Sequence, residues 1–284
     1  MAPPPEIDFS KIGPTAFTVS SARRLTDIPY AKELADLSEA QRLGRLPLIL
    51  EARYKAINEV IARHRIKQFL ELASGFLPRG LAISEDPGVT FIESDLPAMI
   101  SHKRHLIGRL EVERPNLHFL GIDATARPNQ FLQCEAHFKA GEPVMILCEG
   151  LMMYLTVEEK ELVCVNVREV LQRYGGLWVT PDFSSTAGLK RLLQNAPELE
   201  RRVQSLTNLT GRSLADNAFE TLDQARQFVR EQGFHLVERS MLNVADQLSC
   251  LEVLEIEIEA ARKVLSTQSV FSLTLSAHDR GENR

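Results

Sequence analysis

From residue 67 onward, short apolar runs alternate with amphipathic segments, and this alternation constrains the fold more than any other feature of the chain. Such alternation is typical of βαβ units, in which helices cross over between the parallel strands of one sheet. The fold class is therefore expected to be α/β, with a mostly parallel sheet. The predicted strands are residues 68–72, 89–95, 117–122, 144–149, 177–182, 234–240 and 269–277.

Helices are predicted between these strands, and the clearest of them begins after Thr156. Thr156 and Glu159 have the spacing of a capping box, in which each side chain accepts a backbone N–H at the helix start. The helix is expected to end at Gly175, because glycine readily adopts the left-handed conformation that closes a helix. Further helices are expected at residues 46–64, 97–113, 129–139, 222–233 and 251–266.

One domain is expected over residues 1–284, with four parts. Residues 1–65 are Pro-rich at first and then helical, which predicts an N-terminal helical cap. Residues 66–183 hold the parallel strands of a cofactor-binding core. Residues 184–221 are polar with a helical tendency, which predicts an inserted lid over an acceptor, although a helical decoration is an equal alternative. Residues 222–284 complete the sheet.

The composition argues against several classes of function. The chain carries a net charge of −5, so an electrostatic nucleic-acid interface is not expected. No apolar run approaches the roughly 20 residues of a membrane span, and the N-terminus lacks the regions of a signal peptide. The four cysteines are far apart, which disfavours a metal site and fits a reducing cytoplasm. We therefore expect a cytoplasmic protein without nucleic-acid, membrane or metal partners.

Acidic residues end several of the predicted strands. Glu149 closes the apolar run that begins at Pro143, and it must either leave the sheet edge or meet a partner, because burying an unpaired carboxylate is costly. Glu93 and Asp95 end the second predicted strand on the same face, so spacing does not choose between them. Asp123 ends the third. The carboxyl ends of parallel strands meet at one edge of an open sheet, where ligands bind.

These acids have both functional and structural interpretations. A carboxylate can accept hydrogen bonds from both hydroxyls of a ribose, which suits Glu93 or Asp95. Asp123 lies where an adenine amino group could be contacted. Alternatively, Asp95 could cap the following helix and Asp123 could stabilise a turn.

The turn after the first predicted strand contains small residues, which let a ligand approach the backbone closely. Glu71 precedes Ala73, Ser74 and Gly75, and it could hold this loop or the amino group of a ligand. An ordinary connection explains the turn equally well. Taken together, the acids predict a crevice for a ligand with ribose hydroxyls and a positive charge, and S-adenosylmethionine carries both.

Three motifs then give the chain a resemblance to a known family. They are Leu72-Ala73-Ser74-Gly75-Phe76, Phe91-Ile92-Glu93-Ser94-Asp95-Leu96-Pro97 followed by Lys103, and Cys148-Glu149-Gly150-Leu151-Met152-Met153-Tyr154-Leu155. Upstream, Ala52-Arg53-Tyr54 and Ala22-Arg23-Arg24 extend a match that covers residues 16–183 in order. The chain resembles the leucine carboxyl methyltransferase family, in its bacterial polyketide O-methyltransferase-like branch.

The resemblance implies the class I methyltransferase (Rossmann-like) fold, with a seven-stranded mostly parallel sheet, a reversed last strand, a helical cap and an inserted lid. It also implies S-adenosylmethionine as cofactor and O-methylation of a small-molecule acceptor in secondary metabolism. By motif position, Tyr154 and Arg24 would face the acceptor. The implied cofactor contacts are Arg53 at the carboxylate, Glu149 near the amino group, Asp95 at the ribose, Asp123 and Ala124 at adenine, and Ala73, Ser74 and Gly75 along the methionine part.

The expected reaction places few demands on the protein. Methyl transfer from a sulfonium requires alignment of acceptor, methyl group and sulfur. A carboxylate acceptor is already ionised and needs only orientation, for which Arg24, Arg53 and Tyr154 are candidates. A hydroxyl acceptor would need a base. No histidine lies in a motif, so no general base is assigned.

The sequence departs from the family pattern in two places. Ala73 replaces the first motif glycine, and its methyl group is expected to narrow the approach to the backbone. Leu77-Pro78-Arg79 replaces a common Asp-Thr-Arg. These departures leave a non-catalytic relative as an alternative function. A nucleotide-dependent oxidoreductase on a doubly wound sheet is a second alternative, which the missing GxGxxG disfavours.

Overall fold

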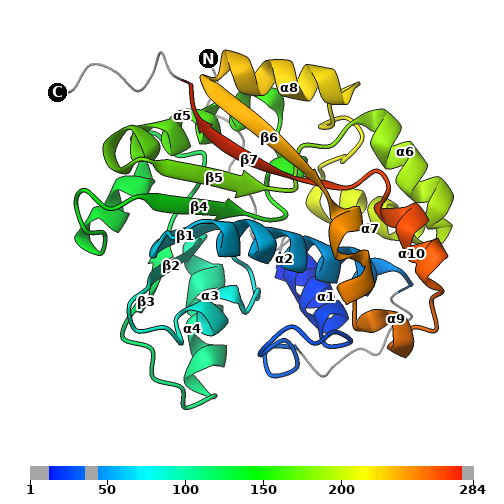
Figure 1. Ribbon diagram of the computed structural model, residues 1–284, viewed down its shortest axis with the longest axis horizontal. Helices are drawn as coiled ribbons and strands as arrows, with labels where there is room; N and C mark the ends of the chain where they lie inside the picture. The colour runs from blue at the N-terminus through cyan, green and yellow to red at the C-terminus, as the bar shows by residue number, and fades with distance from the viewer. Residues whose placement is uncertain (1–12, 36–43, 277–284) are drawn as a thin grey trace.

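The centre of the molecule is one seven-stranded sheet with the order β3-β2-β1-β4-β5-β7-β6 (Figure 1). The computed structural model describes residues 13–35 and 44–276. Strands β1 to β5 pair in parallel, whereas β7 runs antiparallel to both β5 and β6. The predicted mostly parallel sheet with a reversed last strand is confirmed. The strands are β1 (Gln68–Leu72), β2 (Thr90–Asp95), β3 (Leu117–Gly121), β4 (Val144–Cys148), β5 (Gly176–Thr180), β6 (Phe234–Ser240) and β7 (Ser269–Leu275).

The strand order reverses beside β1. The chain runs outward from β1 through β2 to β3 and then returns to place β4 on the other side of β1. At such a reversal, the connections leave the carboxyl ends of the two central strands in opposite directions and open a crevice. The carboxyl ends of β1 and β4 are therefore where a ligand site is expected.

Alternate side chains along the strands enter separate hydrophobic layers on the two faces of the sheet. Phe69 and Phe91 pack with one set of helices, and Leu70 and Ile92 pack with the other. The first set is α2 (Leu46–Arg63), α3 (Arg79–Ile83), α4 (Pro97–Gly108), η5 (Met241–Gln247), α9 (Cys250–Val253) and α10 (Ile258–Leu265). The second set is η2 (Gln130–Ala136), η3 (Met152–Tyr154), α5 (Val157–Tyr174) and α8 (Leu222–Glu231).

Helices α1 (Gly13–Arg23) and α2 precede the first strand. Ala22 of α1 packs on Leu50 of α2. Glu51 fixes α2 to the C-terminal half, because its carboxylate accepts hydrogen bonds from the backbone N–H groups of Ser249 at 2.8 Å and Cys250 at 2.9 Å. The helical N-terminal part is thus attached to both halves of the sheet.

The segment of residues 184–221 leaves the sheet after β5 and forms α6 (Thr186–Asn195), η4 (Pro197–Leu199) and α7 (Glu200–Thr210). A bridge between Ser185 and Phe219 joins the two ends of this excursion. No residue of α6 is fully buried, although Leu189, Leu192 and Leu193 share one face. The predicted helical insertion is confirmed, and its role as a lid stays a prediction.

Three predicted helices differ from the structure. Residues 129–139 hold only the 3-10 helix η2, because Asn129 accepts the Phe131 N–H and closes a tighter turn. The helix predicted at residues 251–266 is divided into α9 and α10. Between them, Glu255 has a φ of 52°, a left-handed conformation that ends a helix. The helix predicted to reach residue 113 ends earlier, as α4.

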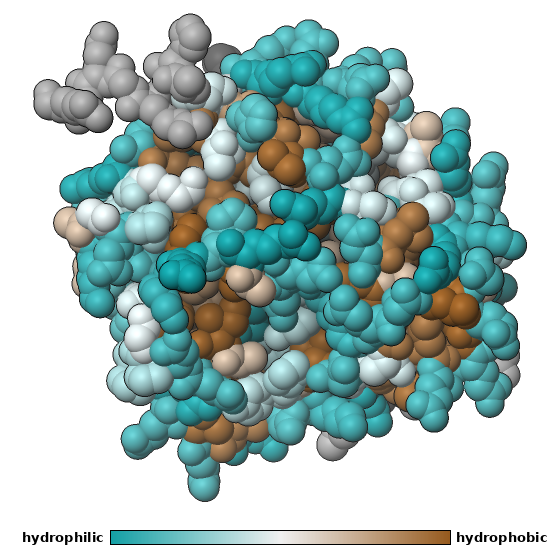
Figure 2. Space-filling model, in the orientation of Figure 1, coloured by the Kyte–Doolittle hydropathy of each residue, from teal (hydrophilic) through white to brown (hydrophobic). Residues whose placement is uncertain are grey.

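Figure 2 shows that the face seen in Figure 1 is mainly hydrophilic, with apolar patches between the polar side chains. All four cysteines are buried and unpaired. In the described part of the chain, no helix is both long enough and apolar enough to cross a bilayer.

Candidate active site

The acids predicted at the strand ends line one cavity at the carboxyl edge of the sheet. Asp95 ends β2, Asp123 follows β3, and Glu149 comes directly after β4. All three line a cavity of about 200 Å³, which we call the strand-end cavity. The other predicted site residues that line it are Arg53, Ala73, Ser74, Gly75, Ala124 and Tyr154. The fold therefore brings together most of the residues that the sequence pattern singles out.

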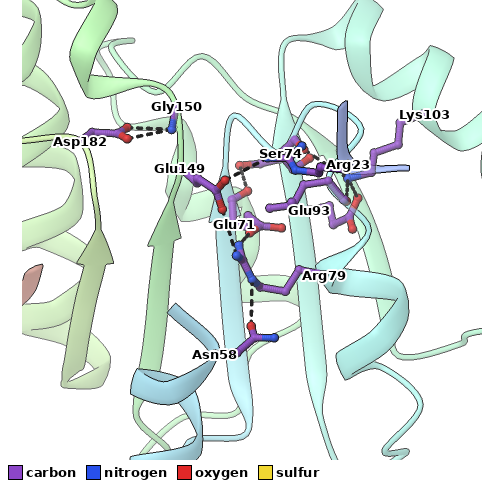
Figure 3. Close-up of polar contacts among 12 residues, drawn as sticks. Arg23, Asn58, Glu71, Ser74, Arg79, Glu93, Lys103, Glu149, Gly150 and Asp182 are labelled. Atoms are coloured by element: carbon purple, nitrogen blue, oxygen red, sulfur yellow. Dashed lines mark hydrogen bonds and ion pairs between the residues drawn. The ribbon is translucent and has the colours of Figure 1, made fainter. Parts of the chain in front are cut away.

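Glu149 is held by two arginines (Figure 3). Its Oε1 accepts a hydrogen bond from Arg23 Nη2 at 2.9 Å, and its Oε2 accepts one from Arg79 Nη2 at 3.0 Å. Burial would raise the pKa of Glu149, but the charges of Arg23, Arg79 and Arg53 outweigh this effect and lower the pKa. Glu149 is therefore ionised, and within the protein its partners are guanidinium groups.

Arg79 connects Glu149 to Glu71 beneath the small-residue turn. The Arg79 side chain is fully buried, forms an ion pair with Glu71 and lies over the Tyr54 ring, 4.8 Å from the ring centroid. Its Nε donates to Asn58 Oδ1 at 3.3 Å. Glu71 does not line the strand-end cavity, which corrects its assignment to the cofactor. Its carboxylate instead compensates the charge of Arg79 below the cavity floor.

The structure distinguishes Glu93 from Asp95, although both side chains lie on the same face of β2. Glu93 is fully buried against Gly80 and forms an ion pair with Lys103, which is also buried. Burial raises the pKa of Glu93 to about 7, against the opposing charge of Lys103. Asp95, two residues further along, is the acid that lines the cavity.

Asp95 fixes the small-residue turn to the end of β2. Its Oδ2 accepts the Gly75 N–H at 2.8 Å, and its Oδ1 accepts the Leu96 N–H at 2.7 Å. Burial raises the pKa of Asp95, and these hydrogen bonds partly offset the rise. Leu96 is the N-cap residue of α4, so the alternative in which Asp95 caps that helix is wrong.

Ala73 adopts a backbone conformation that favours glycine. Its φ is 50°, and that of Gly75 is 45°. The left-handed region costs an L-residue about 1–2 kcal/mol, so the turn holds Ala73 in a strained conformation. The turn is held by Ser74, whose N–H donates to the Ser94 carbonyl at 2.9 Å. Ala73 lines the strand-end cavity, and the expected effect of its methyl group on the approach to the backbone stays a prediction.

Asp123 stabilises a turn in the cavity wall, and its contact with adenine stays a prediction. Its Oδ1 accepts hydrogen bonds from the N–H and the hydroxyl of Thr125, each at 2.8 Å, so it stabilises a turn. The same turn lines the cavity through Asp123, Ala124 and Thr125. The turn therefore places Asp123 in the wall of the strand-end cavity.

Asp182, which the sequence reasoning missed, holds the segment after β4. It follows β5 and is almost fully buried. Its carboxylate accepts backbone N–H groups from Gly150 at 2.9 Å, Leu151 at 2.7 Å and Met152 at 3.0 Å. Burial raises its pKa. Its position at the end of the fifth predicted strand was the available signal, because the other strand-end acids follow the same pattern.

A second cavity, of about 380 Å³, lies between α6 and the start of β7, and we call it the lid cavity. Arg53 and Met153 line both cavities. Arg53 forms no hydrogen bond or ion pair with any described residue, and its Nε is buried without a partner. The junction of the two cavities therefore contains a cation that acts on Glu149 and Asp182 through its charge but is not held by a described hydrogen bond or ion pair. Tyr154 lines the strand-end cavity nearby, and burial raises its pKa.

The arginine of α1 that reaches the strand-end cavity is Arg23. It is 6% exposed and lines the cavity together with Ala16 and Val19. Arg24 lines neither cavity, which corrects its assignment to the acceptor. Consecutive side chains of a helix point about 100° apart, so only one of the two adjacent arginines can face the cavity. The sequence does not show which of them does.

We call residues 184–221 the lid segment. Its C-terminal end is attached beside the strand-end cavity. Arg212 lines the strand-end cavity and contacts both carboxylate oxygens of Glu159, at 2.5 and 2.8 Å. Its Nη1 also donates to the Tyr154 carbonyl at 3.0 Å, and Asn217 Nδ2 donates to the same carbonyl at 2.9 Å. The Glu159 side chain therefore caps α5 and also binds Arg212, which attaches the end of the lid segment to this helix.

The charged side chains that line the two cavities are arginines, aspartates and glutamates. Among the described residues, no histidine, lysine or cysteine lines either of them. The same part of the chain contains no group of three or more His, Cys, Asp or Glu side chains that could hold a metal ion. The lining acids all accept hydrogen bonds already, and they are Asp95, Asp123, Glu149, Asp182 and Glu238.

The family model for leucine carboxyl methyltransferase matches residues 14–168, which is more than half of the chain. The chain belongs to the leucine carboxyl methyltransferase family. The matched part runs from α1 into α5 and contains Arg23, Arg53, Arg79 and the strand-end acids up to Glu149. The lid segment and Asp182 lie beyond it.

Curated relatives match this family assignment. A Mycobacterium ulcerans protein, named provisionally as an S-adenosyl-L-methionine-dependent methyltransferase, is 27% identical over 139 residues, or 48% of this chain and 44% of that protein. A Mycolicibacterium paratuberculosis protein of the same name is 26% identical over 149 residues, or 51% and 48%. The chain therefore spans about half the length of the curated relatives it matches.

Solved structures share the fold. A duf574 family protein from Streptomyces avermitilis has a TM-score of 0.58 at 15% identity, covering 92% of this chain and 97% of that one. Magnesium protoporphyrin IX methyltransferase from Synechocystis, with bound SAH, has a TM-score of 0.51 at 10% identity, covering 95% and 100%. At these identities the likeness concerns the fold alone, and it agrees with the expected class I methyltransferase fold.

Proposed function

We propose that the protein transfers a methyl group from S-adenosylmethionine to a carboxylate of a small molecule. The observation that carries this proposal is the junction of the strand-end cavity and the lid cavity at Arg53 and Met153. The first cavity lies at the switch point of the sheet, where ligands of such folds bind. The second lies beneath an inserted helix and can receive an acceptor.

The residues of the strand-end cavity fit the cofactor. Asp95 offers carboxylate oxygens to a ribose, and Glu149 offers negative charge to an amino group or a sulfonium. Arg53, whose Nε is buried without a partner, would hold the cofactor carboxylate or orient the acceptor beside it. When bound, S-adenosylmethionine supplies an electrophilic methyl group that an acceptor oxygen takes up as the C–S bond breaks, which leaves S-adenosylhomocysteine.

The walls favour a carboxylate over a hydroxyl as the acceptor. A hydroxyl must lose a proton during the transfer, whereas a carboxylic acid with a pKa near 4 is ionised at neutral pH. Among the described residues, neither cavity is lined by a histidine, lysine or cysteine, and each lining carboxylate that could act as a base already accepts a hydrogen bond within the protein. Arg53 supplies the cation that a carboxylate needs for orientation.

The alternatives are weaker. The chain lacks the dinucleotide fingerprint and belongs to a methyltransferase family, so an oxidoreductase has no observation in its favour. A relative that binds the cofactor without turnover is favoured only by the two departures from the family pattern, at the strained Ala73 and at Leu77.

Calorimetry with S-adenosylhomocysteine tests the cofactor. The wild type should bind, and Asp95→Asn should bind at least about tenfold more weakly, because it removes a charged hydrogen-bond acceptor. Asp86→Asn is the matched control, because Asp86 is exposed and paired with Lys67 at the surface. Absence of binding by folded wild type would contradict the cofactor, and unchanged affinity of Asp95→Asn would contradict the ribose contact.

Transfer of labelled methyl from S-adenosylmethionine to a panel of small acids and phenols tests the acceptor. Methyl esters release methanol in base, whereas methyl ethers do not. We expect base-labile products, and we expect their formation to be lost in Arg53→Gln. A product set that is entirely base-stable would contradict the carboxylate.

A further inference from the structure

The lid cavity has unused hydrogen-bond donors and no unused carboxylate among the described residues. Asp182 accepts three backbone N–H groups. Glu238 is paired with Arg226 and accepts the Ser269 hydroxyl at 2.7 Å. By contrast, Arg53 and Arg191 line the cavity, and neither forms a hydrogen bond or ion pair with a described residue. The charged side chains of the wall that form no ion pair with a described residue are therefore both cations.

The two arginines lie in different parts of the cavity. Arg53 belongs to α2 and lies at the junction with the strand-end cavity. Arg191 belongs to α6, is exposed to solvent and lines the lid cavity alone. Figure 1 shows α2 across the centre of the molecule and α6 at its right-hand side. A ligand that fills the lid cavity up to its junction with the strand-end cavity would meet both arginines.

The remaining wall combines apolar side chains with the polar residues Ser184, Ser185, Thr221, Ser266, Thr267, Gln268 and Ser269. Phe183 and Phe271 lie on the sheet side, and Leu189 and Leu192 lie on α6. No residue of α6 is fully buried, so the packing surface of these leucines is incomplete in the protein alone. An apolar ligand body would complete it.

We infer that the acceptor is a dicarboxylate with an apolar body, in which Arg53 orients the carboxylate that is methylated and Arg191 binds the other. This inference rests on the proposed function. One oxygen of the first carboxylate forms the new bond to the methyl carbon, the electron pair of the C–S bond stays on sulfur, and no proton moves. The second carboxylate is unchanged, and the product is a monoester.

Binding to protein saturated with S-adenosylhomocysteine tests the inference. The probes are straight-chain dicarboxylates and the monocarboxylates of the same chain lengths, measured by calorimetry. At the best length, the dicarboxylate should bind at least about tenfold more tightly, because it adds a charge-assisted contact. Arg191→Gln should remove this preference by lowering dicarboxylate affinity to that of the monocarboxylate of the same length.

Lys190→Gln provides the matched control, because Lys190 is the preceding residue of α6, is exposed and lines neither cavity. It should keep the dicarboxylate preference, and Arg191→Lys should keep part of it. Equal affinity for the two series, a preference that survives Arg191→Gln, or no binding of any dicarboxylate would overturn the inference. Binding of S-adenosylhomocysteine is measured first, because its failure would contradict the proposed function itself.

Discussion

The strand-end cavity and the lid cavity share Arg53 and Met153 but are built differently. In the strand-end cavity the buried acid Glu149 is already paired, with Arg23 and Arg79. In the lid cavity, Arg191 and the shared Arg53 form no hydrogen bond or ion pair with a described residue. Paired charges at buried strand ends fix the geometry of a site, whereas unpaired donors on a helix are free to meet a ligand.

The difference suits the two ligands that we propose. A cofactor is the same in every turnover of every relative, so its site can be rigid and its polar groups can be fixed in advance. Many functions occur on one fold, because function depends on the sites that are added to it. The lid segment, with no fully buried residue in α6, is the part of this molecule that can vary at small cost.

Arg79→Gln should remove the ion pairs beneath the strand-end cavity and have the largest effect on the free energy of unfolding. It leaves Glu71 and Glu149 buried with one guanidinium fewer between them. Removing one partner of a buried ion pair costs about 3–5 kcal/mol, so the free energy of unfolding in urea should fall by at least that amount. The surface pair of Arg114 and Glu85 gives the control, because Arg114→Gln should cost less than about 1 kcal/mol. Similar losses in the two variants would refute the contrast between buried and exposed pairs.

The pair of Glu93 and Lys103 should make stability depend on pH. Because burial raises the pKa of Glu93 from 4.5 to about 7, the folded state keeps a proton that the unfolded state releases in that window. The free energy of unfolding should therefore fall as pH rises from about 4.5 to about 7, by up to about 1.4 kcal/mol per pH unit. The double variant Glu93→Gln/Lys103→Met should lack this contribution. Parallel stability curves for wild type and double variant would show that the prediction is wrong.

Ala73→Gly should raise the free energy of unfolding slightly, because it changes the strained turn that lines the strand-end cavity. Glycine relieves a left-handed conformation that costs about 1–2 kcal/mol, and loses about 0.5–1 kcal/mol through the entropy of the unfolded chain. We expect a net gain of about 0.5–1 kcal/mol by thermal or chemical denaturation. Ala82→Gly, in α3, is the opposite control and should cost about 1 kcal/mol. A loss of stability in Ala73→Gly would mean that the turn does not strain the alanine.

Arg53→Gln should cost less stability than Arg79→Gln, because Arg53 acts on Glu149 and Asp182 only through its charge and forms no hydrogen bond or ion pair with a described residue. The same substitution at Arg79 is predicted above to be severe, so the two variants compare an unpaired cation with a paired one. Ligand binding should nevertheless fall in Arg53→Gln. A strongly destabilised Arg53→Gln would place Arg53 among the structural ion pairs instead.

Much of the site could be predicted because strand ends are visible in the sequence. Asp95, Asp123 and Glu149 each follow an apolar run, and the topology of a parallel sheet brings such positions to one edge. Helix faces were less informative. Arg24 was chosen instead of Arg23, because adjacent arginines on a helix of weak amphipathic character carry no signal of direction.

The sequence by itself determined the alternation of strands and helices, the acids at the strand ends and the motifs of the family, because these depend on local order along the chain. Tertiary structure alone decided which charges compensate each other. Glu71 and Glu149 share Arg79, and Arg53 is left without a described partner, because burial in a low-dielectric interior makes pairing obligatory for some groups and leaves others at a cavity wall. Pairing depends on distances between residues far apart in the chain, and these exist only in the folded protein.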